Sequence, residues 1–304
     1  MSAPSTILIS GASGFVGSAL SARLAAGGHR VGRLVRRPSD DPATVRWDPA
    51  RGVAQLERFA EYETVVHLAG ENLAGGRWSE RMKRELRSSR IDGTRVIADA
   101  IRDSGRDRTT FACASAVGFF GDRGDEVLRE GSPAGRGFLA ELCRDWEAAA
   151  LGAESEGTRV TCLRFGVVLG RDGGALAKML PVFRLGLGGP LGSGRQYMSW
   201  VSLDDVVGAI VHTISNPTLR GPIHVVAPQS LTNEEFTKAI GRALRRPTFL
   251  RVPAFALRLL LGEMTEATLL ASQRMKPARL LDAGFTFQFP EIDEFLRREL
   301  RSGR

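Results

Sequence analysis

The sequence predicts an α/β protein with a doubly wound parallel sheet, followed by a smaller C-terminal part. Through the first half of the chain, short β-rich segments alternate with helical segments, and the connections between them are short. This alternation favours parallel strands with helices on both faces of the sheet. A glycine-rich turn at 11–17 joins the first strand to the first helix. After residue 186 the pattern changes to a long glycine loop with shorter elements, which indicates the second part.

The elements of the first half follow from the apolar pattern. Strands are expected at 6–10, 31–35, 44–47, 64–69, 110–115 and 159–165. Helices are expected at 15–26, 53–60, 78–104, 138–156 and 173–184.

The elements of the second half are marked by helix-end signals. Beyond the glycine loop at 186–194, the pattern predicts strands at 199–202 and 221–226. One helix is opened by Asp204 and Asp205, and another is capped at Thr232 or Asn233 with Glu235 in its first turn. An apolar helix is expected at 253–271 and a closing helix from Glu291. We therefore divide the chain into a nucleotide-binding domain, 1–247, and a small C-terminal module, 248–304, with ligand-side elements mainly at 168–247.

The turn at 11–17 carries the clearest functional signal in the chain. It follows an apolar strand and opens a helix, which is the context in which three spaced glycines are typical of dinucleotide binding in a Rossmann-type fold. The first glycine permits the tight turn, the second lets the backbone approach a pyrophosphate, and the third lets the helix pack on the strand. The first helical turn offers its N–H groups to the phosphates. The candidate residues are Gly11, Ser13, Gly14, Phe15, Val16 and Gly17. The alternative is a purely structural turn.

The end of the second predicted strand selects between the two nicotinamide cofactors. An acidic residue there binds the ribose 2′-hydroxyl, whereas arginine accommodates a 2′-phosphate. Here Arg36 and Arg37 follow the strand, and the next carboxylate is Asp40. Because a guanidinium suits a phosphate dianion, Arg36 is predicted to bind the cofactor, and NADP(H) is favoured over NAD(H). The alternative is that both arginines are ordinary surface residues.

Small residues end the fourth predicted strand, at Leu68, Ala69 and Gly70. They would let the adenosine half of the cofactor lie against the backbone. His67 precedes them inside an apolar run, where a hydrogen-bonded structural histidine is more typical than a catalytic base. His212 and His224 lie far apart in sequence, so no metal site is predicted.

Length and composition exclude several classes of protein. The 304 residues are 43% hydrophobic and 25% charged, as in ordinary globular proteins. No apolar stretch approaches the roughly 18 residues of a membrane span, and the N-terminus leaves no room for a signal peptide. We therefore expect no membrane partner. Cys113, Cys143 and Cys162 lack a Cys-x-x-Cys spacing, which favours reduced thiols in a cytoplasmic protein.

The net charge of +8 would permit nucleic-acid binding. The densest basic stretch, 77–90, is interleaved with Glu80 and Glu85. A nucleic-acid surface is more often an unbroken basic face with aromatic platforms. We therefore expect no nucleic-acid partner but a small-molecule substrate, and the sequence leaves the oligomeric state open.

Several short motifs occur in order along nearly the whole chain. They are Gly70-Glu71-Asn72, Arg77-Trp78, Ser89-Arg90, Ser115-Ala116-Val117-Gly118, Trp146-Glu147, Gly166-Val167-Val168-Leu169-Gly170, the loop 188–194, Ala227-Pro228 and Thr232-Asn233. This series resembles the atypical extended short-chain dehydrogenase/reductase group called "epimerase family protein" (YfcH-like), including its C-terminal module from about Pro247. The resemblance implies the extended short-chain dehydrogenase fold and NADP(H). It also implies cofactor contacts, beside the glycines, at Arg36, Leu68, Ala69, Glu85, Arg90 and Val168.

The catalytic residues usual in extended short-chain dehydrogenases are incomplete here. Those enzymes use a serine after the fifth strand and a Tyr-x-x-x-Lys pair on the next helix, whose phenol moves a proton. Ser115 ends the predicted strand and is the candidate catalytic serine. Alignment on Glu147 puts Leu139 at the tyrosine and Cys143 at the lysine. Neither side chain can perform that proton transfer.

Three replacements for the missing acid stay open. Tyr197 in the glycine loop could supply the proton, Glu141 or Asp145 could serve on the helix, or the substrate could carry its own donor. The sequence does not select among them.

The segment after the glycine loop is predicted to face the substrate. Gln196, Tyr197 and Trp200 suit the wall of a pocket for a planar or moderately apolar molecule. For Trp200, a core position is an equal alternative. Nucleotide-sugar epimerases resemble this region. Here, however, Met198 stands where an arginine usually meets the sugar-nucleotide phosphate, and Arg195 is the alternative contact.

The sequence therefore predicts an NADP(H)-binding oxidoreductase of the extended short-chain type, with an atypical active site and an unknown substrate. The main alternative is a non-catalytic NADP(H)-sensing protein. A sugar-nucleotide epimerase is a further alternative.

Overall fold

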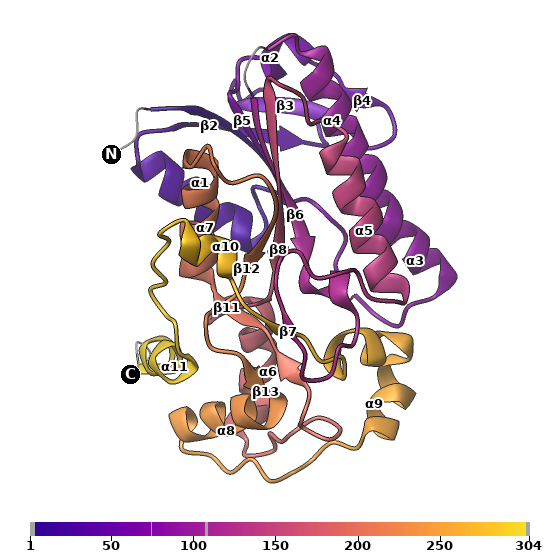
Figure 1. Ribbon diagram of the computed structural model, residues 1–304, viewed down its shortest axis with the longest axis vertical. Helices are drawn as coiled ribbons and strands as arrows, with labels where there is room; N and C mark the ends of the chain where they lie inside the picture. Colours follow the sequence, from indigo (N-terminus) through magenta and orange to yellow (C-terminus); the bar gives the residue numbers. More distant parts are fainter. Residues whose placement is uncertain (1–3, 74, 107–108, 302–304) are drawn as a thin grey trace.

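An eight-stranded sheet forms the centre of the computed structural model, which describes residues 4–73, 75–106 and 109–301 (Figure 1). The strand order is β12-β8-β6-β5-β1-β2-β3-β4. Neighbouring strands are parallel except for the β3–β4 pair. The strands are β1 (Thr6–Ser10), β2 (Arg30–Val35), β3 (Thr44–Asp48), β4 (Gly52–Val53), β5 (Thr64–His67), β6 (Thr109–Ala116), β8 (Thr158–Phe165) and β12 (Gly221–Val225). The predicted doubly wound parallel sheet is confirmed.

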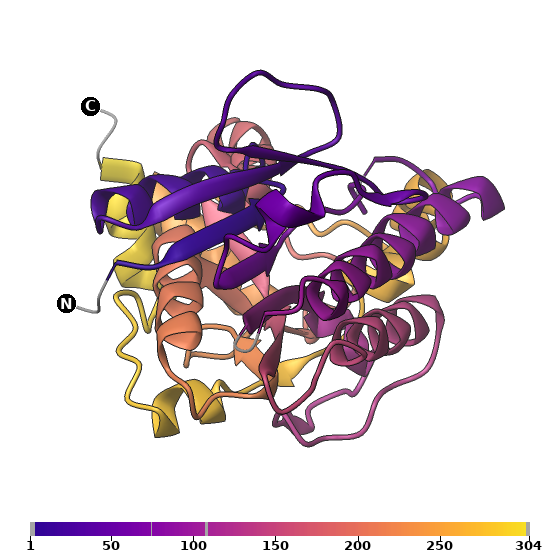
Figure 2. The same cartoon turned by 90° about the horizontal axis from the view of Figure 1, so that it is seen from above.

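Helices cover both faces of this sheet because its strands are apolar on both sides. Within β1, Ile7 and Ile9 belong to the core cluster formed with α1 (Phe15–Ala26) and α7 (Leu203–Ser215). Leu8 between them belongs to the cluster on the other face, with α4 (Gly93–Asp103) and α5 (Phe138–Leu151). Figure 2 shows these helix pairs on opposite sides of the sheet. All three β1 side chains are at most 1% exposed.

The strand order reverses beside β1, which fixes where a ligand can bind. The chain extends from β1 to β2 and β3 on one side, and through β5, β6, β8 and β12 on the other. At such a switch point, the loops that leave the carboxyl ends of the two neighbouring strands diverge and open a crevice. Here those are the loops after β1 and β5.

The second part of the molecule has its own apolar core. It consists of β9 (Val167–Gly170), α6 (Gly174–Arg184), β10 (Tyr197–Met198), β11 (Trp200–Ser202), β13 (Leu231–Thr232), α8 (Asn233–Leu244) and α11 (Ile292–Arg301). Trp200, Phe236 and Phe295 are the largest fully buried members of its core cluster. In Figure 1 this part lies below the sheet.

The last fifty residues pack back on the rest of the chain. They form α9 (Ala254–Leu261), a π-helical turn (Thr265–Leu269), β14 (Arg274–Met275), α10 (Ala278–Asp282) and α11. β14 pairs with β7 (Val127–Leu128). The backbone N–H groups of Gln288 and Phe289 donate to the buried carboxylate of Asp205, at 2.6 and 3.0 Å. Within the described residues, no helix is both long enough and apolar enough to cross a membrane.

Four predicted helices differ from the structure. The predicted helix at 138–156 ends at Leu151, where Gly152 is the C-cap. The predicted helix at 53–60 is replaced by β4, which ends at Val53, and the short α2 (Leu56–Phe59). The predicted helix at 78–104 consists of α3 (Glu80–Arg87), a π-helical turn (Ser88–Asp92) and α4. The predicted helix at 253–271 ends at Leu261, because Gly262 adopts a φ of +63°, which glycine tolerates and a helix does not. By contrast, the predicted cap at Thr232 is confirmed, since Thr232 and Glu235 form a reciprocal capping box.

Candidate functional site

The glycine turn between β1 and α1 has the close packing that its glycines predict. Gly11 has a φ of +69°, and a Cβ there would lie 2.9 Å from the backbone N of Ala69. A Cβ on Gly17 would collide with the carbonyl oxygen of Gly11. Both positions therefore require glycine, because a side chain would push the helix or the neighbouring loop away from β1.

The N-terminus of α1 is open to solvent and suited to an anion. Ser13 and Gly14 are exposed, and Gly14 caps the helix without a side-chain hydrogen bond. The first turn, which contains Phe15, Val16 and Gly17, carries no acidic residue. Its N–H groups have no acceptors within the helix, and the helix dipole is positive at this end. This arrangement fits the pyrophosphate of a dinucleotide.

The loop after β5 is held against the glycine turn by a buried hydrogen-bond network. The Ser10 hydroxyl lies 2.5 Å from Nδ1 of His67 and accepts from the backbone N–H groups of Leu68 and Ala69, at 3.1 and 3.3 Å. His67 is completely buried, and burial, with a smaller effect of nearby Arg90, lowers its pKa to about 3. The prediction that His67 is a hydrogen-bonded structural residue is confirmed.

Arg36, the residue predicted to select the cofactor, follows the last residue of β2. It is exposed, as is Arg37, immediately beyond the carboxyl end of β2. Arg33, which lies within β2, pairs with Asp41 of the loop between β2 and β3. The geometry thus leaves Arg36 available at the edge of the crevice.

Arg90 reaches the same crevice from the π-helical turn. Its guanidinium donates to the carbonyl oxygen of Glu71 at 2.9 Å and lies 5.2 Å from the ring of Trp146. A Cβ on Gly70 would lie 3.4 Å from the Arg90 guanidinium carbon, so the two predicted residues are neighbours. Because a π-helical turn changes the angular spacing of side chains, Arg90 points inward and is only 8% exposed. Glu85, one turn earlier, lies on the exposed face 3.8 Å from Arg81.

Val168 of β9 completes the predicted cofactor surface. It packs on the same apolar cluster as Val16 and Leu68, although the three residues come from distant parts of the sequence. The ring of Phe15 fills the space over Gly170 and Gly173, where any Cβ would collide with or crowd it. The structure therefore brings β9, the glycine turn and the loop after β5 together.

Ser115, the candidate catalytic serine, lies in a buried polar cluster at the end of β6. It is 2% exposed, and its hydroxyl donates to Oε1 of Glu147 at 2.6 Å. Arg164 donates to both oxygens of Glu147, at 2.7 and 2.8 Å, and is 3% exposed. The hydroxyl therefore faces α5, because a buried carboxylate needs every donor it can obtain. Successive side chains of a strand point to opposite faces, so the side chain directed the other way is that of Ala116.

The positions of the missing Tyr-x-x-x-Lys pair are apolar in the structure as well. Leu139 and Cys143, both on α5, are 7% and 2% exposed. A Cβ on Gly118 would lie 3.3 Å from Leu139 and 3.7 Å from the sulfur of Cys143. Burial raises the pKa of the Cys143 thiol to about 12, with a further increase from nearby Glu147. Cys143 is therefore neutral and is no substitute for the lysine.

The three predicted pocket residues have different environments. Trp200 is 0% exposed and packs against Phe295, which corresponds to its alternative role as a core residue. Gln196 is 6% exposed, and its amide donates to the carbonyl oxygens of Leu191 and Leu269. Tyr197 is half-buried, and the guanidinium of Arg274 lies 4.8 Å from its ring. Of the three, Tyr197 is the side chain that solvent reaches most easily.

Sequence reasoning missed the pairing of Arg164 with Glu147. An arginine inside the apolar strand 158–165 is the signal that could have revealed it, because a buried guanidinium requires a carboxylate or several carbonyl partners. In the described ranges, no cluster of three or more His, Cys, Asp or Glu is arranged to hold a metal ion.

Comparisons with known proteins agree with this geometry. A family model described as "NAD dependent epimerase/dehydratase family" matches residues 7–227, and a "Domain of unknown function (DUF1731)" matches 252–299. An epimerase family protein of Mycobacterium leprae is 46% identical over 290 residues, covering 95% of this chain and 94% of the relative. The crystal structure of human epimerase family protein SDR39U1 with NADPH has a TM-score of 0.90 at 34% identity, covering 97% of this chain and 99% of that one.

A further solved structure belongs to a longer chain, of which this protein matches only a part. A nucleoside-diphosphate sugar epimerase from Corynebacterium glutamicum is 37% identical with a TM-score of 0.81, and the match covers 98% of this chain but 58% of that one. Together with the family match over most of the sheet, these likenesses show that the chain belongs to the NAD dependent epimerase/dehydratase family, in its epimerase family protein group.

Proposed function

We propose that this protein binds NADP(H) along the carboxyl edge of its sheet and is an oxidoreductase. The observation that carries the proposal is the open N-terminus of α1 behind a turn in which Gly11 and Gly17 are sterically required. Arg36 at the end of β2 supports the phosphorylated cofactor. The human relative whose structure contains NADPH supports the same choice.

Each segment around the crevice would hold a different part of the cofactor. The first turn of α1 would bind the pyrophosphate, and Arg36 the 2′-phosphate. The loop 68–70 would lie against the adenosine half, with Arg90 behind it. Val168 would pack against the cofactor from the β9 side.

When bound, NADPH supplies a hydride to a carbonyl or a related group. The same reaction also needs a proton. Leu139 and Cys143 are not proton donors at neutral pH, and the Ser115 hydroxyl already donates its hydrogen bond to Glu147. Tyr197 is the half-buried phenol of the second part, whereas Tyr62 is 3% exposed beneath the sheet. We propose Tyr197, or an acidic group of the substrate itself, as the proton donor.

The other candidate acids on α5 fit this role less well. Asp145 pairs with Arg87 at 2.6 Å, on the outer side of the helix. Glu141 is exposed.

The second candidate function is an NADP(H) sensor without catalysis. It is favoured by the buried, apolar character of α5 at Leu139 and Cys143, where the enzymes of the superfamily carry their reactive pair. Such a protein would still need the intact cofactor crevice, and its cofactor state would alter a contact with another molecule.

The decisive experiment has two stages on the full-length protein. Fluorescence titration measures whether NADPH binds, and NADPH consumption is then followed with a panel of aldehydes, ketones and quinones. Turnover that falls in Tyr197→Phe, while NADPH affinity is kept, supports the oxidoreductase with Tyr197 as donor. Tight binding without turnover on any carbonyl supports the sensor. Absence of NADPH binding contradicts both.

We also propose that the protein works in a reducing compartment. Cys113, Cys143 and Cys162 are all free thiols and all buried. Mass spectrometry of the natively purified protein should find three unmodified thiols, and any disulfide would contradict this.

A further inference from the structure

Two segments of the chain contain several cations and no acidic residue. Residues 173–203 contain three Lys or Arg and no Asp or Glu, and residues 236–262 contain six Lys or Arg and no Asp or Glu. Together they hold nine positive charges, whereas the formal net charge of the whole chain is +8. The rest of the chain is therefore close to neutral, and the charge excess belongs to one region.

The same two segments expose most of the large apolar side chains. Of the eleven such residues that the described part of the chain exposes, eight lie here: Val182, Leu185, Leu187, Phe249, Leu250, Phe255, Leu259 and Leu260. Phe249 is 75% exposed, Phe255 70% and Leu259 73%. Large exposed apolar patches on a folded protein mark interaction surfaces.

The two segments lie against each other and form one surface. Leu191 and Val252 form a β-bridge, with the Val252 N–H donating to the Pro190 carbonyl at 2.9 Å. A Cβ on Gly189 would collide with the backbone of Leu250, so the two backbones are in direct contact. We call this the basic apolar surface. It lies at the lower end of the molecule in Figure 1, between α8 and α9.

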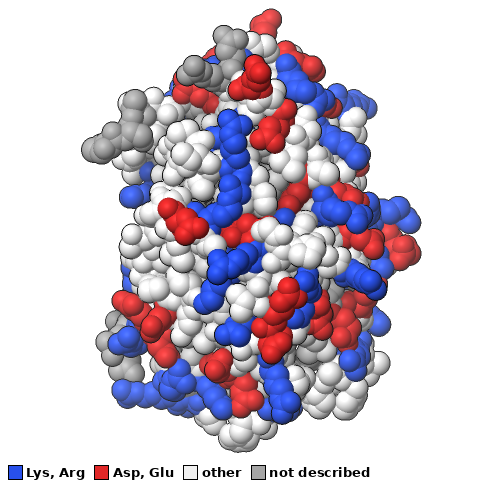
Figure 3. Space-filling view, viewed as in Figure 1, with Lys and Arg blue, Asp and Glu red and all other residues white. Residues whose placement is uncertain are grey.

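Several cations of this surface are not neutralised. Among the described residues, Arg184, Arg245 and Arg246 have no ion pair. The acids that flank the surface are already paired: Glu234 with Lys238 and Arg251, and Glu266 with Arg258. Figure 3 shows uncharged surface at the lower right, over α9, with Lys and Arg side chains beside it. The surface thus combines free positive charge with unburied apolar area.

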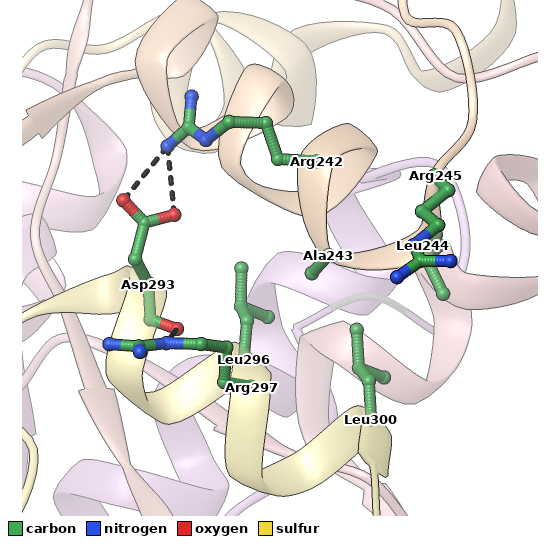
Figure 4. A pocket seen from close by; sticks show the side chains of 8 residues that line it. All are labelled: Arg242, Ala243, Leu244, Arg245, Asp293, Leu296, Arg297 and Leu300. Atoms are coloured by element: carbon green, nitrogen blue, oxygen red, sulfur yellow. Dashed lines mark hydrogen bonds and ion pairs between the residues drawn. The ribbon is translucent and has the colours of Figure 1, made fainter.

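Next to the basic apolar surface lies a hollow between α8 and α11. Figure 4 shows Leu244, Leu296 and Leu300 in this hollow of about 690 Å³, with Arg242 and Arg245 around it. Arg242 is held by Asp293 at 2.8 and 2.9 Å, and Arg245 is not paired. Arg245 also has a φ of 54° and is the C-cap of α8, so the helix ends here and the chain turns away from its axis.

We propose that the basic apolar surface docks this protein on the surface of an anionic lipid bilayer. The lipid headgroups would face the free arginines, and Phe249, Phe255, Leu259 and Leu260 would enter the boundary of the acyl chains. α9 has only eight residues, so it lies on the bilayer and does not cross it. The proposal replaces the expectation of no membrane partner, which rested on the absence of a spanning segment.

Two other occupants fit the surface less well. A second copy of the chain would bring the unpaired Arg184, Arg245 and Arg246 of both copies close together, at a cost in electrostatic repulsion. A nucleic acid would neutralise the arginines but leave the exposed leucines in water. An anionic bilayer satisfies both the charge and the apolar area.

The test is sedimentation of the full-length protein with vesicles of phosphatidylcholine, with and without phosphatidylglycerol. We expect binding only with phosphatidylglycerol, and less of it as salt is raised. Arg245→Gln/Arg246→Gln should lower the partition coefficient about fivefold for each arginine removed. Phe249→Ser/Phe255→Ser should lower it by about tenfold or more. The matched controls are Arg81→Gln and Leu281→Ser, whose side chains are exposed outside this surface, and both should bind like the unchanged protein.

A spectroscopic reporter locates the docking face. The four natural tryptophans are at most 8% exposed, so Phe249→Trp adds one exposed indole, whose emission should shift to shorter wavelength on anionic vesicles. Leu281→Trp should show no shift.

Absence of vesicle binding at low salt, or equal losses in surface and control variants, would overturn the proposal. A dimer in solution that Phe249→Ser/Phe255→Ser converts to a monomer would overturn it in favour of an interface between copies. Far-ultraviolet circular dichroism of each variant, compared with that of the unchanged protein, verifies that the variants are folded.

Discussion

Arg36 is exposed just beyond β2, and we expect the cofactor preference of this protein to depend on it. We expect NADPH to bind more tightly than NADH by about tenfold or more, because a charge-assisted phosphate contact contributes roughly 1.5–3 kcal/mol. Arg36→Ala should remove most of that difference in fluorescence titrations. Arg37→Ala is the matched control, since Arg37 is equally exposed and adjacent. Equal affinity of the unchanged protein for both cofactors would contradict the assignment.

The Ser115–Glu147–Arg164 cluster leads to a prediction about stability. Arg164→Met leaves the buried Glu147 carboxylate without its main partner and should lower the free energy of unfolding by about 3–5 kcal/mol. Ser115→Ala removes one hydrogen bond to a charged group and should cost about 1.5–3 kcal/mol. NADPH affinity should change little in Ser115→Ala, because the groups predicted to hold the phosphates lie on α1 and at Arg36.

Urea denaturation with and without NADPH measures both effects. Ser18→Ala, at an exposed position of α1, is the control for a serine without a buried partner. A Ser115→Ala protein of unchanged stability that loses turnover on an established substrate would show that the hydroxyl acts in the crevice instead.

At the residue scale, the sequence predicted the close packing of the glycine turn better than the environment of Ser115. The close backbone approach at Gly11 and Gly17 follows from local chain geometry, which a short motif specifies. The environment of Ser115 depends on Glu147 and Arg164, which lie 32 and 49 positions further along the chain. Contacts of that kind are fixed by the packing of α5 on the sheet, and no local pattern encodes them.

Among the elements, prediction succeeded where a helix or strand is amphipathic or fully buried over its whole length. β1, α1 and α6 lie at or within one residue of the expected ranges. The predicted helix at 253–271 was wrong beyond Leu261, because a single glycine with positive φ at 262 ends it. The π-helical turn at 88–92 was not predicted, because its extra residue per turn leaves no compositional signal.

Helix α5 leads to a prediction about the reaction. We expect that the protein does not interconvert UDP-glucose and UDP-galactose. Leu139 and Cys143 are buried in place of the reactive pair, and Met198 stands where an arginine usually meets the sugar-nucleotide phosphate. Prolonged incubation with either cofactor, followed by chromatography, is the measurement. A UDP-glucose 4-epimerase assayed in parallel is the positive control. Interconversion at about one turnover per second or faster would refute the alignment of α5 and restore the sugar-nucleotide alternative.

For the whole molecule, the doubly wound sheet was predictable because alternating strands and helices with short connections allow few other arrangements. The arrangement of the second part was not. Its sheets are pairings of two or three residues between distant segments, such as β10 with β13, β9 with β11 and β7 with β14. Such short strands have no periodicity to read, and their partners are chosen by the packing of the C-terminal segment.

Two buried histidines make the stability of the whole fold depend on pH. Burial lowers the pKa of both His67 and His224 to about 3, from an ordinary value of 6.5. Above pH 6.5 both are neutral in the folded and the unfolded chain, so stability is full. Below it only the unfolded chain takes up these protons, so stability falls by about 1.4 kcal/mol per pH unit for each histidine until the folded pKa is reached. Urea denaturation between pH 6 and 5, above the titration of most carboxylates, should therefore show a loss approaching 2.8 kcal/mol, by the same estimate. His224→Gln should halve that slope, because it removes one of the two buried histidines. Its amide can still donate to the Lys276 carbonyl, which lies 3.0 Å from Nδ1 of His224. A stability that stays constant across this interval would mean that both histidines are already protonated in the folded protein, which their burial in the core does not allow.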